Sequence, residues 1–557
     1  MVHRLQHIAD LVAICGLHGV ETVVISPGSR NAPLINAFYR KFGNACISIV
    51  DERSAGYVAL GIARYTRHPV VIICTSGTAV LNYSPAIAEA YYQRIPMIVI
   101  TADRPAEWID QQDNQTIRQK NVYQNFIKKS ISLPERTVGE KELISLRRDM
   151  QECIQLASIA SMGPVHINAP LYEPLYEELP VEGSDIGILT EKKVSGKVLP
   201  RTFITQWKEA KKILIVHGQD FPDESRTRAM QALSADPRVV IIAENIANSA
   251  IGKMIRNPEL MLARTKKEQL DIPDLLIYAG GQVVSKRLKE LLRSWKIVGS
   301  WRIGRDNYDM DTFRQGNRYL RIEPGIVYTI LAKHISKADN PTNFKRSWLS
   351  ASMHVSAESV SAFADLPFSD LSAVYALMEQ LPDDLIIELG NSSAIRYSQL
   401  LPDVVKAVYY SNRGVSGIDG CLSAAVGTAL STEKPTLVIL GDLSFVYDSN
   451  ALWNRRLPKN IKIVVLNNSG GGIFDLIPGP ADSDAFNDFF IARHPVNLQK
   501  LAETFYLDYF CVRTKQDLVS VIPEFLGRKV RPVMLEVVTD RKKNKDAFFA
   551  VLKGICS

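Results

Sequence analysis

The sequence has no closely spaced pair of cysteines. Its seven cysteines stand singly, at positions 15, 46, 74, 153, 421, 511 and 556, and no CxxC motif occurs. Structural zinc sites and disulfide frameworks use cysteines in pairs or regular groups. The cysteine pattern therefore argues against both kinds of site. It favours a reducing compartment and predicts a cytoplasmic protein.

Long apolar runs and a strong charge imbalance are also missing. No apolar run approaches the ~20 residues that a membrane-spanning helix needs, and the residues before Asp10 predict no signal peptide. The net charge is only +7, and the densest basic run, at 541–545, is short. We therefore expect neither a membrane span nor a nucleic-acid partner. A small positive excess suits an enzyme that binds small anions.

The order of the predicted elements indicates the fold class. A chain of 557 residues is long enough for about three domains. Buried strands alternate with helices, which is typical of parallel sheets covered on both faces. We predict an α/β fold of three doubly wound parallel-sheet domains, at residues 1–178, 179–355 and 356–557, with an acidic linker near 175–200. The predicted strands are 22–26, 45–50, 70–74, 97–101, 212–216, 239–243, 275–279, 384–388, 407–411, 435–440, 460–466 and 532–538.

The loops that follow the predicted strands differ between the domains. In the first domain they are polar (SPGSRN, DERS, TSGT and TADRP) and should share one rim of the sheet. In the middle domain, Gly280-Gly281 ends a strand, but neither a GxGxxG nor a Walker A pattern occurs. The middle domain therefore gives no signal for a nucleotide.

The third domain carries the most informative spacing. Asp442 ends the strand 435–440, and Asn468, 26 residues later, ends the strand 460–466 after a stretch, 444–456, that can be helical. One strand–helix–strand unit thus brings a carboxylate and an amide oxygen to the carboxyl end of the sheet, where α/β proteins bind ligands. Mg²⁺ prefers such oxygens together with phosphate, and helix N-terminal amides bind anions. The pattern predicts a magnesium-bound diphosphate; the plainer interpretation is a strand-end Asp turn and an Asn-Gly loop.

Four local strings are similar to one enzyme family. They are SPGSRNAP at 26–33, TADRP at 101–105, NRGVSGIDG at 412–420 and GDLS at 441–444. With Asp442, Asn468 and the strand-end Glu52, they resemble thiamine diphosphate enzymes of the pyruvate oxidase and decarboxylase type over the whole chain. Within that group they resemble the transferases that make 2-succinyl-5-enolpyruvyl-6-hydroxy-3-cyclohexene-1-carboxylate in menaquinone biosynthesis. Leu443, where the wider group has glycine, fits this branch.

The resemblance implies a cofactor and a way to hold it. It implies thiamine diphosphate with Mg²⁺, for which Mn²⁺ can substitute, the metal being bound by Asp442, Asn468 and the Gly470 carbonyl. The first domain would bind the aminopyrimidine and the third the diphosphate, in a homodimer or homotetramer with active sites at subunit interfaces. Glu52 would be catalytic, at N1′ of the aminopyrimidine, and Ile418 would lie beneath the cofactor. The implied cofactor-binding residues are Glu52, Thr78, Asn391, Ser416, Ile418, Gly441, Asp442, Leu443, Ser444, Asn468, Gly470 and Ile473.

Two of these residues, Glu52 and Ile418, also have a plainer interpretation. Taken alone, Glu52 is equally an acidic charge at the N-terminus of a helix. Taken alone, Ile418 is a core isoleucine.

The resemblance also implies the substrates 2-oxoglutarate and isochorismate. Both carry two carboxylates, so the site needs several fixed cations, preferably arginines. Matching strings assign Ser29, Arg30, Arg104, Asn114, Gln115, Lys286 and Arg287 to isochorismate, and Ser392, Arg396 and Arg413 to the succinyl side. Ile473, Phe474 and Ile477 follow the glycine loop and would separate the reaction from water. Each arginine alone is more often a surface residue.

Two other functions stay open at this point. The nearer is another thiamine diphosphate carboligase or 2-oxoacid decarboxylase, such as an acetohydroxyacid-synthase-like enzyme, which product analysis with pyruvate would reveal. The other, from a different class, is a flavin- or nucleotide-binding α/β protein that uses the middle domain. A yellow purified protein would favour that second alternative.

Overall fold

The computed structural model describes residues 3–137, 139–159, 161–180, 198–249, 251–305, 310–336, 340–401 and 406–554, without the side chains of 356–361 and 364. Contacts between Cα atoms divide the chain into two compact units. Unit 1 comprises Met1–Lys193, Asn412–Glu433 and Ser444–Ile461, and unit 2 comprises Val194–Ser411, Lys434–Leu443 and Lys462–Ser557. Among the described residues, no helix is long and apolar enough to cross a membrane. Most of the predicted linker lies at 181–197, outside the described residues.

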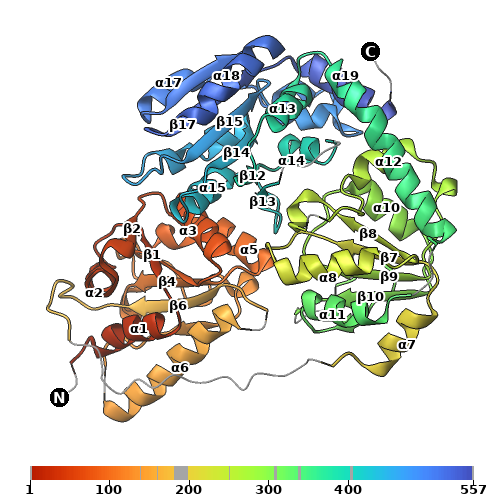
Figure 1. Cartoon of the computed structure of the whole chain (residues 1–557). Helices are drawn as coiled ribbons and strands as arrows, with labels where there is room; N and C mark the ends of the chain where they lie inside the picture. The colour runs from red at the N-terminus through yellow and green to blue at the C-terminus, as the bar shows by residue number, and fades with distance from the viewer. Residues whose placement is uncertain are drawn as a thin grey trace. The chain divides into compact units, whose positions relative to one another are not determined.

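Unit 1 contains a six-stranded sheet in the order β2-β1-β3-β4-β6-β5 (Figure 1). Its strands run parallel, so their carboxyl ends share one rim, as predicted. The strands are β1 Thr22–Ile25, β2 Cys46–Ser48, β3 Val70–Cys74, β4 Met97–Asp103, β5 Ser130–Ser132 and β6 Val165–Pro170. The helices are α1 Gln6–Leu17, α2 Ala32–Phe42, α3 Glu52–Thr66, α4 Thr78–Asn82, α5 Ser84–Gln93, α6 Glu140–Ser158 and α15 Cys421–Leu430.

Two glycines bring α3 and α15 into close contact within unit 1. A Cβ atom on Gly61 would lie 2.0 Å from the carbonyl oxygen of Ala424, and one on Gly427 would lie 2.1 Å from that of Val58. Real Cβ atoms do not approach backbone oxygens so closely. Each helix therefore needs a glycine where it meets the backbone of the other. This packing fixes α3, the helix that begins with Glu52.

Unit 2 contains the middle sheet, in the order β11-β10-β9-β7-β8, with all neighbours parallel. The strands are β7 Ile213–His217, β8 Val239–Ala243, β9 Leu275–Ala279, β10 Gly299–Ile303 and β11 Arg318–Leu320. One face packs on α7 Arg201–Glu209, α8 Glu224–Ser234 and α11 Pro324–Leu331, and the other on α9 Pro258–Arg264, α10 Lys286–Ser294 and α12 Asn343–Ala364 (Figure 1). Helices on both faces make this sheet doubly wound, as predicted.

The third sheet, also in unit 2, has the order β13-β12-β14-β15-β17-β16. Its strands are β12 Ile386–Leu389, β13 Val408–Tyr410, β14 Thr436–Gly441, β15 Ile461–Asn467, β16 Asp508–Val512 and β17 Val533–Val538. Helices of unit 2 that pack with these strands are α13 Asp370–Glu379, α14 Ser393–Ser398, α18 Lys515–Gly527 and α19 Arg541–Lys553, and α17 is Leu498–Thr504. The leucines, isoleucines and valines of the strands are buried, as expected for a sheet covered by helices.

Every strand predicted from an apolar run is present, with ends shifted by at most two residues. The sequence analysis missed five strands: β5, β6, β10, β11 and β16. Several of these carry inward-facing polar groups, such as His166 in β6 and Arg302 in β10, both 0% exposed. Buried polar side chains interrupt the apolar runs by which the other strands were found.

The prediction of a helix over 444–456 was wrong in extent. The helix α16 runs only from Asp442 to Tyr447, and a 3₁₀ turn follows at Ser449–Leu452. Asp448, between them, is buried and accepts hydrogen bonds from the backbone N–H and the hydroxyl of Ser423. The domain limits at 178/179 and 355/356 separate the three sheets, although residue 356 lies inside α12.

Candidate functional site

Asp442 lies where β14 passes directly into α16, at the carboxyl end of the third sheet. Its side chain is 1% exposed, and burial raises its pKa. Its Oδ1 accepts a hydrogen bond from the N–H of Leu443 at 2.7 Å, and its Oδ2 accepts one from the N–H of Gly470 at 2.8 Å. The structure thus brings together Asp442 and Gly470, two of the three predicted metal ligands.

Asn468 presents an amide oxygen without a protein partner. Its Nδ2 donates a hydrogen bond to Asp370 Oδ2 at 2.8 Å, whereas its Oδ1 is buried and has no hydrogen-bond partner among the described residues. A Cβ on Gly472 would lie 3.1 Å from this oxygen, so the glycine leaves it room. A buried oxygen that accepts no hydrogen bond is costly unless another group binds it.

Asp370 and His494, two neighbours of this site, were missed by the sequence analysis. Asp370 is 0% exposed, and burial raises its pKa to about 6, with a contribution from the negative charge of Asp442. The Nε2 of His494 lies 3.4 Å from Asp442 Oδ2. Asp370 begins α13 in a stretch that the sequence analysis did not treat as a site, and His494 follows Asn468 by 26 residues without any local motif. No signal in the sequence joins either residue to Asp442.

The glycine loop after β15 is shaped by the backbone that passes behind it. Gly470 has a φ of +141°, and a Cβ there would lie 2.3 Å from the carbonyl oxygen of Ile491. The N–H of Gly471 donates to the same carbonyl at 2.6 Å. Gly470 cannot be replaced without moving Ile491, and a Cβ on Gly471 would lie 2.6 Å from the carbonyl oxygen of Phe490. The loop therefore holds the Gly470 carbonyl and the Asn468 side chain in a defined conformation.

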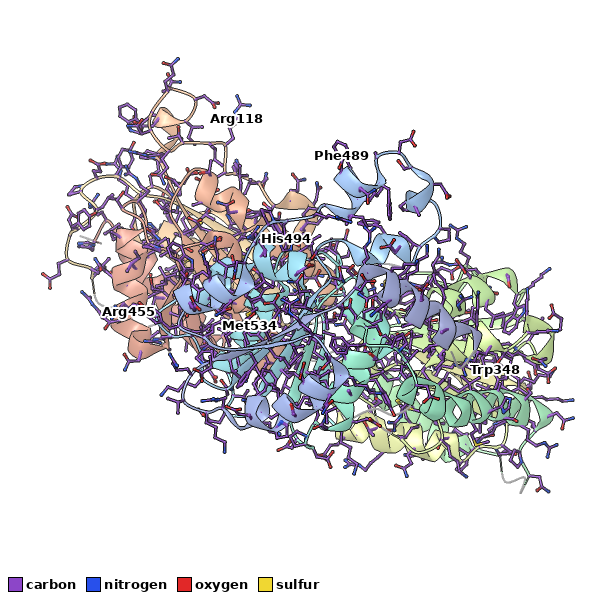
Figure 2. All side chains as sticks on the ribbon, turned by 90° about the horizontal axis from the view of Figure 1, so that it is seen from above. Arg118, Trp348, Arg455, Phe489, His494 and Met534 are labelled. Atoms are coloured by element: carbon purple, nitrogen blue, oxygen red, sulfur yellow. The ribbon has the colours of Figure 1, made fainter. Side chains whose placement is uncertain are left out.

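The residues predicted to exclude water follow this loop. Ile473 and Phe474 lie in a 3₁₀ turn, Gly472–Asp475, and Ile477 comes just after it. The ring of Phe474 packs edge-on against Phe490, with centroids 5.5 Å apart. Figure 2 shows the neighbouring Phe489 projecting outward from this segment, and its side chain is 81% exposed.

The donor set on this edge fits a divalent cation that prefers oxygen. It consists of one carboxylate, one amide oxygen and one backbone carbonyl, which leaves room for phosphate oxygens and water. Within the described residues, no group of three or more His, Cys, Asp or Glu side chains forms a metal site. A set with a single carboxylate agrees with that finding. The unpartnered oxygen of Asn468 is the observation that favours a bound cation here.

Glu52 lies on the rim of the first sheet, in unit 1. It is the first residue of α3, whose N-cap is Asp51, and it is half-buried. Burial and, second, the charge of Glu52 raise the pKa of the Cys74 thiol at the end of β3. Its carboxylate therefore faces the carboxyl end of the sheet. Glu52 thus occupies the helix N-terminal position, and its catalytic role stays a prediction.

The loop 412–420, which carries three predicted residues, is fixed by a buried carboxylate of unit 1. Glu89, 1% exposed, accepts hydrogen bonds from the backbone N–H groups of Gly414 and Val415 at 2.6 Å and of Ser416 at 3.4 Å. Ser416 has a φ of +70°. The Ile418 carbonyl accepts a hydrogen bond from the Ser444 hydroxyl at 2.8 Å. Glu89 was not predicted, because a glutamate inside a helix gives no sign of its partners.

Five of the predicted isochorismate residues gather on the rim of unit 1. Arg30 is 5% exposed, and its pKa is lowered by burial and then by the nearby charge of Arg104. Arg104 pairs with Asp113 at 3.3 Å and donates to the Asn114 carbonyl at 3.2 Å. A Cβ on Gly77 would lie 2.9 Å from the Gln115 side chain. Exposed residues Ser29 and Thr78 lie in the loop before Arg30 and at the start of α4.

The remaining predicted residues lie in unit 2. Ser392 has a φ of +71° at the N-cap of α14, after the buried Asn391. A small pocket is lined by Glu259, Val284, Ser285, Lys286, Arg396, Gln399, Leu400 and Phe548. Lys286 and Arg396, assigned above to different substrates, thus line one pocket. Arg287 lies beside Lys286 and pairs with Glu259 at 3.3 Å.

The carboxyl edge of the middle sheet is filled by the protein itself. A Cβ on Gly218, after β7, would lie 2.1 Å from the Gly281 carbonyl oxygen, after β9. Beside them, His217 Nε2 and Arg226 NH1 contact Asp220 Oδ2 at 3.0 and 2.9 Å. The point between β7 and β9, where α/β sheets bind nucleotides, is closed by this backbone contact. This geometry disfavours a nucleotide or flavin in the middle domain.

Two parts of the chain match known cofactor-binding domains. Residues 8–123 match the thiamine pyrophosphate enzyme N-terminal TPP binding domain, and residues 394–537 match the C-terminal TPP binding domain. Benzoylformate decarboxylase from Polynucleobacter necessarius superposes with a TM-score of 0.67 at 16% identity, covering 97% of this chain and 99% of that one. The three sheets therefore form the pyruvate oxidase and decarboxylase type of fold.

Full-length relatives define the branch. The chain is 43% identical, over 97% of its length and 99% of the relative's, to 2-succinyl-5-enolpyruvyl-6-hydroxy-3-cyclohexene-1-carboxylate synthase of Desulfotalea psychrophila. The synthase of Christiangramia forsetii is 35% identical over 96% of each chain. With both cofactor-binding domains present and this identity along its whole length, the chain belongs to the 2-succinyl-5-enolpyruvyl-6-hydroxy-3-cyclohexene-1-carboxylate synthase family of thiamine diphosphate enzymes.

Proposed function

We propose that the protein is a transferase that decarboxylates 2-oxoglutarate and adds the resulting four-carbon unit, in 1,4 fashion, to isochorismate. The products are CO₂ and 2-succinyl-5-enolpyruvyl-6-hydroxy-3-cyclohexene-1-carboxylate, a step of menaquinone biosynthesis. The observation that carries the proposal is the 43% identity to a synthase of this name, which spans nearly all of both chains. The buried Asn468 oxygen, which has no hydrogen-bond partner among the described residues, independently supports the metal site of this proposal.

The metal and the diphosphate would be held at the edge of the third sheet. Asp442 Oδ, Asn468 Oδ1 and the Gly470 carbonyl would bind Mg²⁺ or Mn²⁺, and phosphate oxygens and water would complete the coordination. The resemblance assigns Leu443 and Ser444, at the start of α16, to the diphosphate, although the Leu443 N–H already donates to Asp442 Oδ1. Asn391, Gly441 and Ile473 border the same edge. Bound thiamine diphosphate supplies the carbon that attacks a keto group and accepts the electrons released as CO₂ leaves.

Glu52 would act at the other end of the cofactor. Its carboxylate would hold a proton at N1′ of the aminopyrimidine. Ile418, in the loop that Glu89 fixes, would support the bent cofactor from below. Glu52 lies in unit 1 and Asp442 in unit 2. We infer that the enzyme is a homodimer or homotetramer in which the two residues that share a cofactor come from different subunits.

The cationic residues would recognise the carboxylates of both substrates. Arg30 and Arg104, close together on the rim of unit 1, with Ser29, Asn114 and Gln115, would bind isochorismate. Ser392, Arg396 and Arg413 would bind the succinyl part, and Lys286 and Arg287 would add positive charge. Ile473, Phe474 and Ile477 would keep water away from the reacting carbon, so that it adds to isochorismate and is not simply protonated.

A coupled assay tests the proposal. Purified protein with thiamine diphosphate and Mg²⁺ is given 2-oxoglutarate and isochorismate, and the product is identified by its mass. We expect the carboxylate product and CO₂ in equal amounts. Turnover of pyruvate alone, with no requirement for isochorismate, would favour a different carboligase or a simple decarboxylase. We infer a cytoplasmic location from the scattered, unpaired spacing of the cysteines in the sequence.

A further inference from the structure

The two ends of the Asn468 side chain are chemically different but alike in shape. A carboxamide can turn by 180° and present either its oxygen or its NH₂ group to the same neighbour. Only the oxygen can bind a metal ion. A second residue must therefore fix the orientation of the Asn468 amide, so that one particular end faces the cation. That residue must accept a hydrogen bond without being able to donate one.

Asp370 has this property. Its ionised carboxylate only accepts hydrogen bonds, and its Oδ2 receives one from Asn468 Nδ2 at 2.8 Å. The Asn468 NH₂ group is thereby tied to Asp370, and Oδ1 is turned to the other side, where it is buried without a partner among the described residues. Turning the amide around would place its oxygen against a carboxylate oxygen. The carboxylate thus fixes the orientation of the amide.

Asp370 is itself held from three sides. The Thr539 hydroxyl donates to its Oδ1 at 2.6 Å, and its backbone N–H donates to Asn544 Oδ1 at 2.7 Å. The side chain of Asn544 in turn donates to the Thr539 hydroxyl at 3.0 Å. Ser369, before it, is the N-cap of α13. The acceptor that orients Asn468 therefore has little freedom to move.

A purely structural role does not account for this carboxylate. Burying a charged group costs free energy, and Asp370 is 0% exposed. An apolar residue at the start of α13 would avoid the cost, and Thr539 could turn its hydroxyl elsewhere. The cost is understandable if the carboxylate is needed for the group to which it points, and that group is Asn468.

We propose that Asp370 is a positioning residue for the metal: it holds Asn468 so that its amide oxygen, and not its NH₂ group, faces the cation of the bound diphosphate. This inference rests on the proposed function, because it takes Asn468 as a metal ligand. Residues that orient a ligand in this way typically change metal affinity about 10–100-fold when replaced. The effect is on binding and precedes any chemistry.

Binding of Mn²⁺ by the full-length protein, measured by EPR of the free ion in the presence of thiamine diphosphate, tests the proposal. Asp370→Leu removes the acceptor at similar size, and we expect it to weaken Mn²⁺ binding about 10–100-fold. Thr539→Val is the matched control, since it removes a different hydrogen bond to the same carboxylate and leaves Asn468 untouched. We expect this control to bind Mn²⁺ within about threefold of the native protein, because the Asp370–Asn468 hydrogen bond stays in place.

An exchange of the two residues tests the direction of the hydrogen bond. In Asp370→Asn with Asn468→Asp, residue 370 becomes the donor and residue 468 the acceptor, while the pair keeps a single negative charge. We expect the double variant to bind Mn²⁺ more tightly than the product of the two single losses predicts. Simply additive losses would overturn the proposal, as would native affinity in a folded Asp370→Leu protein. If Asp370→Leu does not fold, the exchange decides alone.

Asp442→Ala separates this proposal from the function on which it rests. If that variant binds Mn²⁺ and thiamine diphosphate like the native protein, the proposed site is wrong. If it loses binding while the variants at 370 and 468 behave independently of each other, the site stands and only the positioning role of Asp370 is wrong.

Discussion

The middle and third sheets are built alike, but their carboxyl edges are not. In the middle sheet, Asp220 is enclosed by His217 and Arg226, and glycines after β7 and β9 bring the backbones into contact. In the third sheet, Asp442 accepts hydrogen bonds from two backbone N–H groups and has His494 Nε2 at 3.4 Å, and the neighbouring Asn468 oxygen is left without a partner among the described residues. At the edge of the middle sheet, the polar side chains bind one another. At the edge of the third sheet, the Asn468 oxygen remains available to a ligand.

The pKa values of the two carboxyl groups express the same difference. Burial favours a raised pKa for both groups. At Asp220 the hydrogen bond from His217 and the charge of Arg226 outweigh burial and lower the pKa to about 2. At Asp442 burial prevails and the pKa is raised, because no arginine or lysine is paired with it within the described residues. His494, whose Nε2 lies 3.4 Å away, also lowers the pKa of Asp442 but does not outweigh burial. A buried acid of this kind is a candidate for binding a metal cation.

The largest expected effect comes from replacing Asp442 at the carboxyl edge of the third sheet, which we call the open edge. Asp442→Ala removes the only carboxylate of the proposed metal site, so it should abolish measurable binding of thiamine diphosphate and Mg²⁺ and with it activity. Chelation of the native protein should likewise remove activity, and added Mg²⁺ or Mn²⁺ should restore it. Isothermal titration of the cofactor measures binding directly. Full activity of metal-free, cofactor-free protein would contradict the proposed function.

A second prediction concerns the edge of the first sheet, which carries the proposed catalytic group but not the metal ligands. Glu52→Gln should lower kcat about 100–10,000-fold with every substrate, since proton transfer to N1′ is needed in each case. Its affinity for Mn²⁺ and thiamine diphosphate should stay close to native. This combination of readouts distinguishes the two edges.

Mixing the two inactive variants tests whether they belong to different subunits. If a cofactor is shared between chains, a hybrid of Glu52→Gln and Asp442→Ala has one site with both changes and one with neither. Random dimer formation would restore about a quarter of the sites. No recovery after verified subunit exchange would show that both residues act in the same chain.

The carboxyl edge of the middle sheet, closed by contacts within the protein, could not be recognised from the sequence. Much of the open carboxyl edge of the third sheet could. Asp442 and Asn468 each follow an apolar run, so the period of the strands places them at one edge. Asp220 lies in the loop after β7 and Arg226 in α8, neither of them in a recognisable motif, and their partner His217 was seen only as the end of a strand. Which polar groups satisfy one another depends on side-chain packing, and packing has no period in the sequence.

The same limit applies at the candidate site itself. Asp370 and His494 lie far from Asn468 in the chain, and Glu89 is 325 residues from Gly414, whose N–H it accepts. Residues of this kind act through a single hydrogen bond formed by the tertiary structure. The sequence therefore yields candidate ligands of the cofactor, but it gives no sign of the groups that hold these candidates in place.

A further prediction concerns Asp220, at the closed carboxyl edge of the middle sheet. Asp220→Ala leaves Arg226, 2% exposed, without its ion pair and should destabilise unit 2 by about 3–5 kcal/mol, with little change in cofactor affinity. Because the folded-state pKa of Asp220 lies below its usual value, its stabilisation is present above about pH 4 and is lost as the pH falls toward 2. The difference in unfolding free energy between native and variant should shrink over that window. Unfolding in urea at several pH values measures it.

The smallest expected effects come from replacing two arginines of unit 2, one buried and one exposed. Arg302, in the middle sheet, is 0% exposed and donates to the Gly280 carbonyl at 2.7 Å, so Arg302→Ala should lower stability and leave KM unchanged. Arg396 is exposed and lines the pocket that also contains Lys286. Arg396→Ala should leave stability nearly native and raise KM for 2-oxoglutarate about ten- to hundredfold, because a hydrogen bond to a charged group is worth about 1.5–3 kcal/mol.

The corresponding test for isochorismate uses Arg104, which is less buried than Arg30 and less necessary for folding. Arg104→Ala should raise the isochorismate concentration needed for half-maximal rate, while CO₂ release from 2-oxoglutarate alone continues at the native rate. Arg413→Ala should resemble Arg396→Ala instead, because both are assigned to the succinyl side. Cofactor affinity should be native in all three, since none is a proposed ligand of the metal or the diphosphate. If Arg104→Ala stopped CO₂ release while Arg396→Ala changed only the isochorismate requirement, the two substrates would have to exchange places in the site.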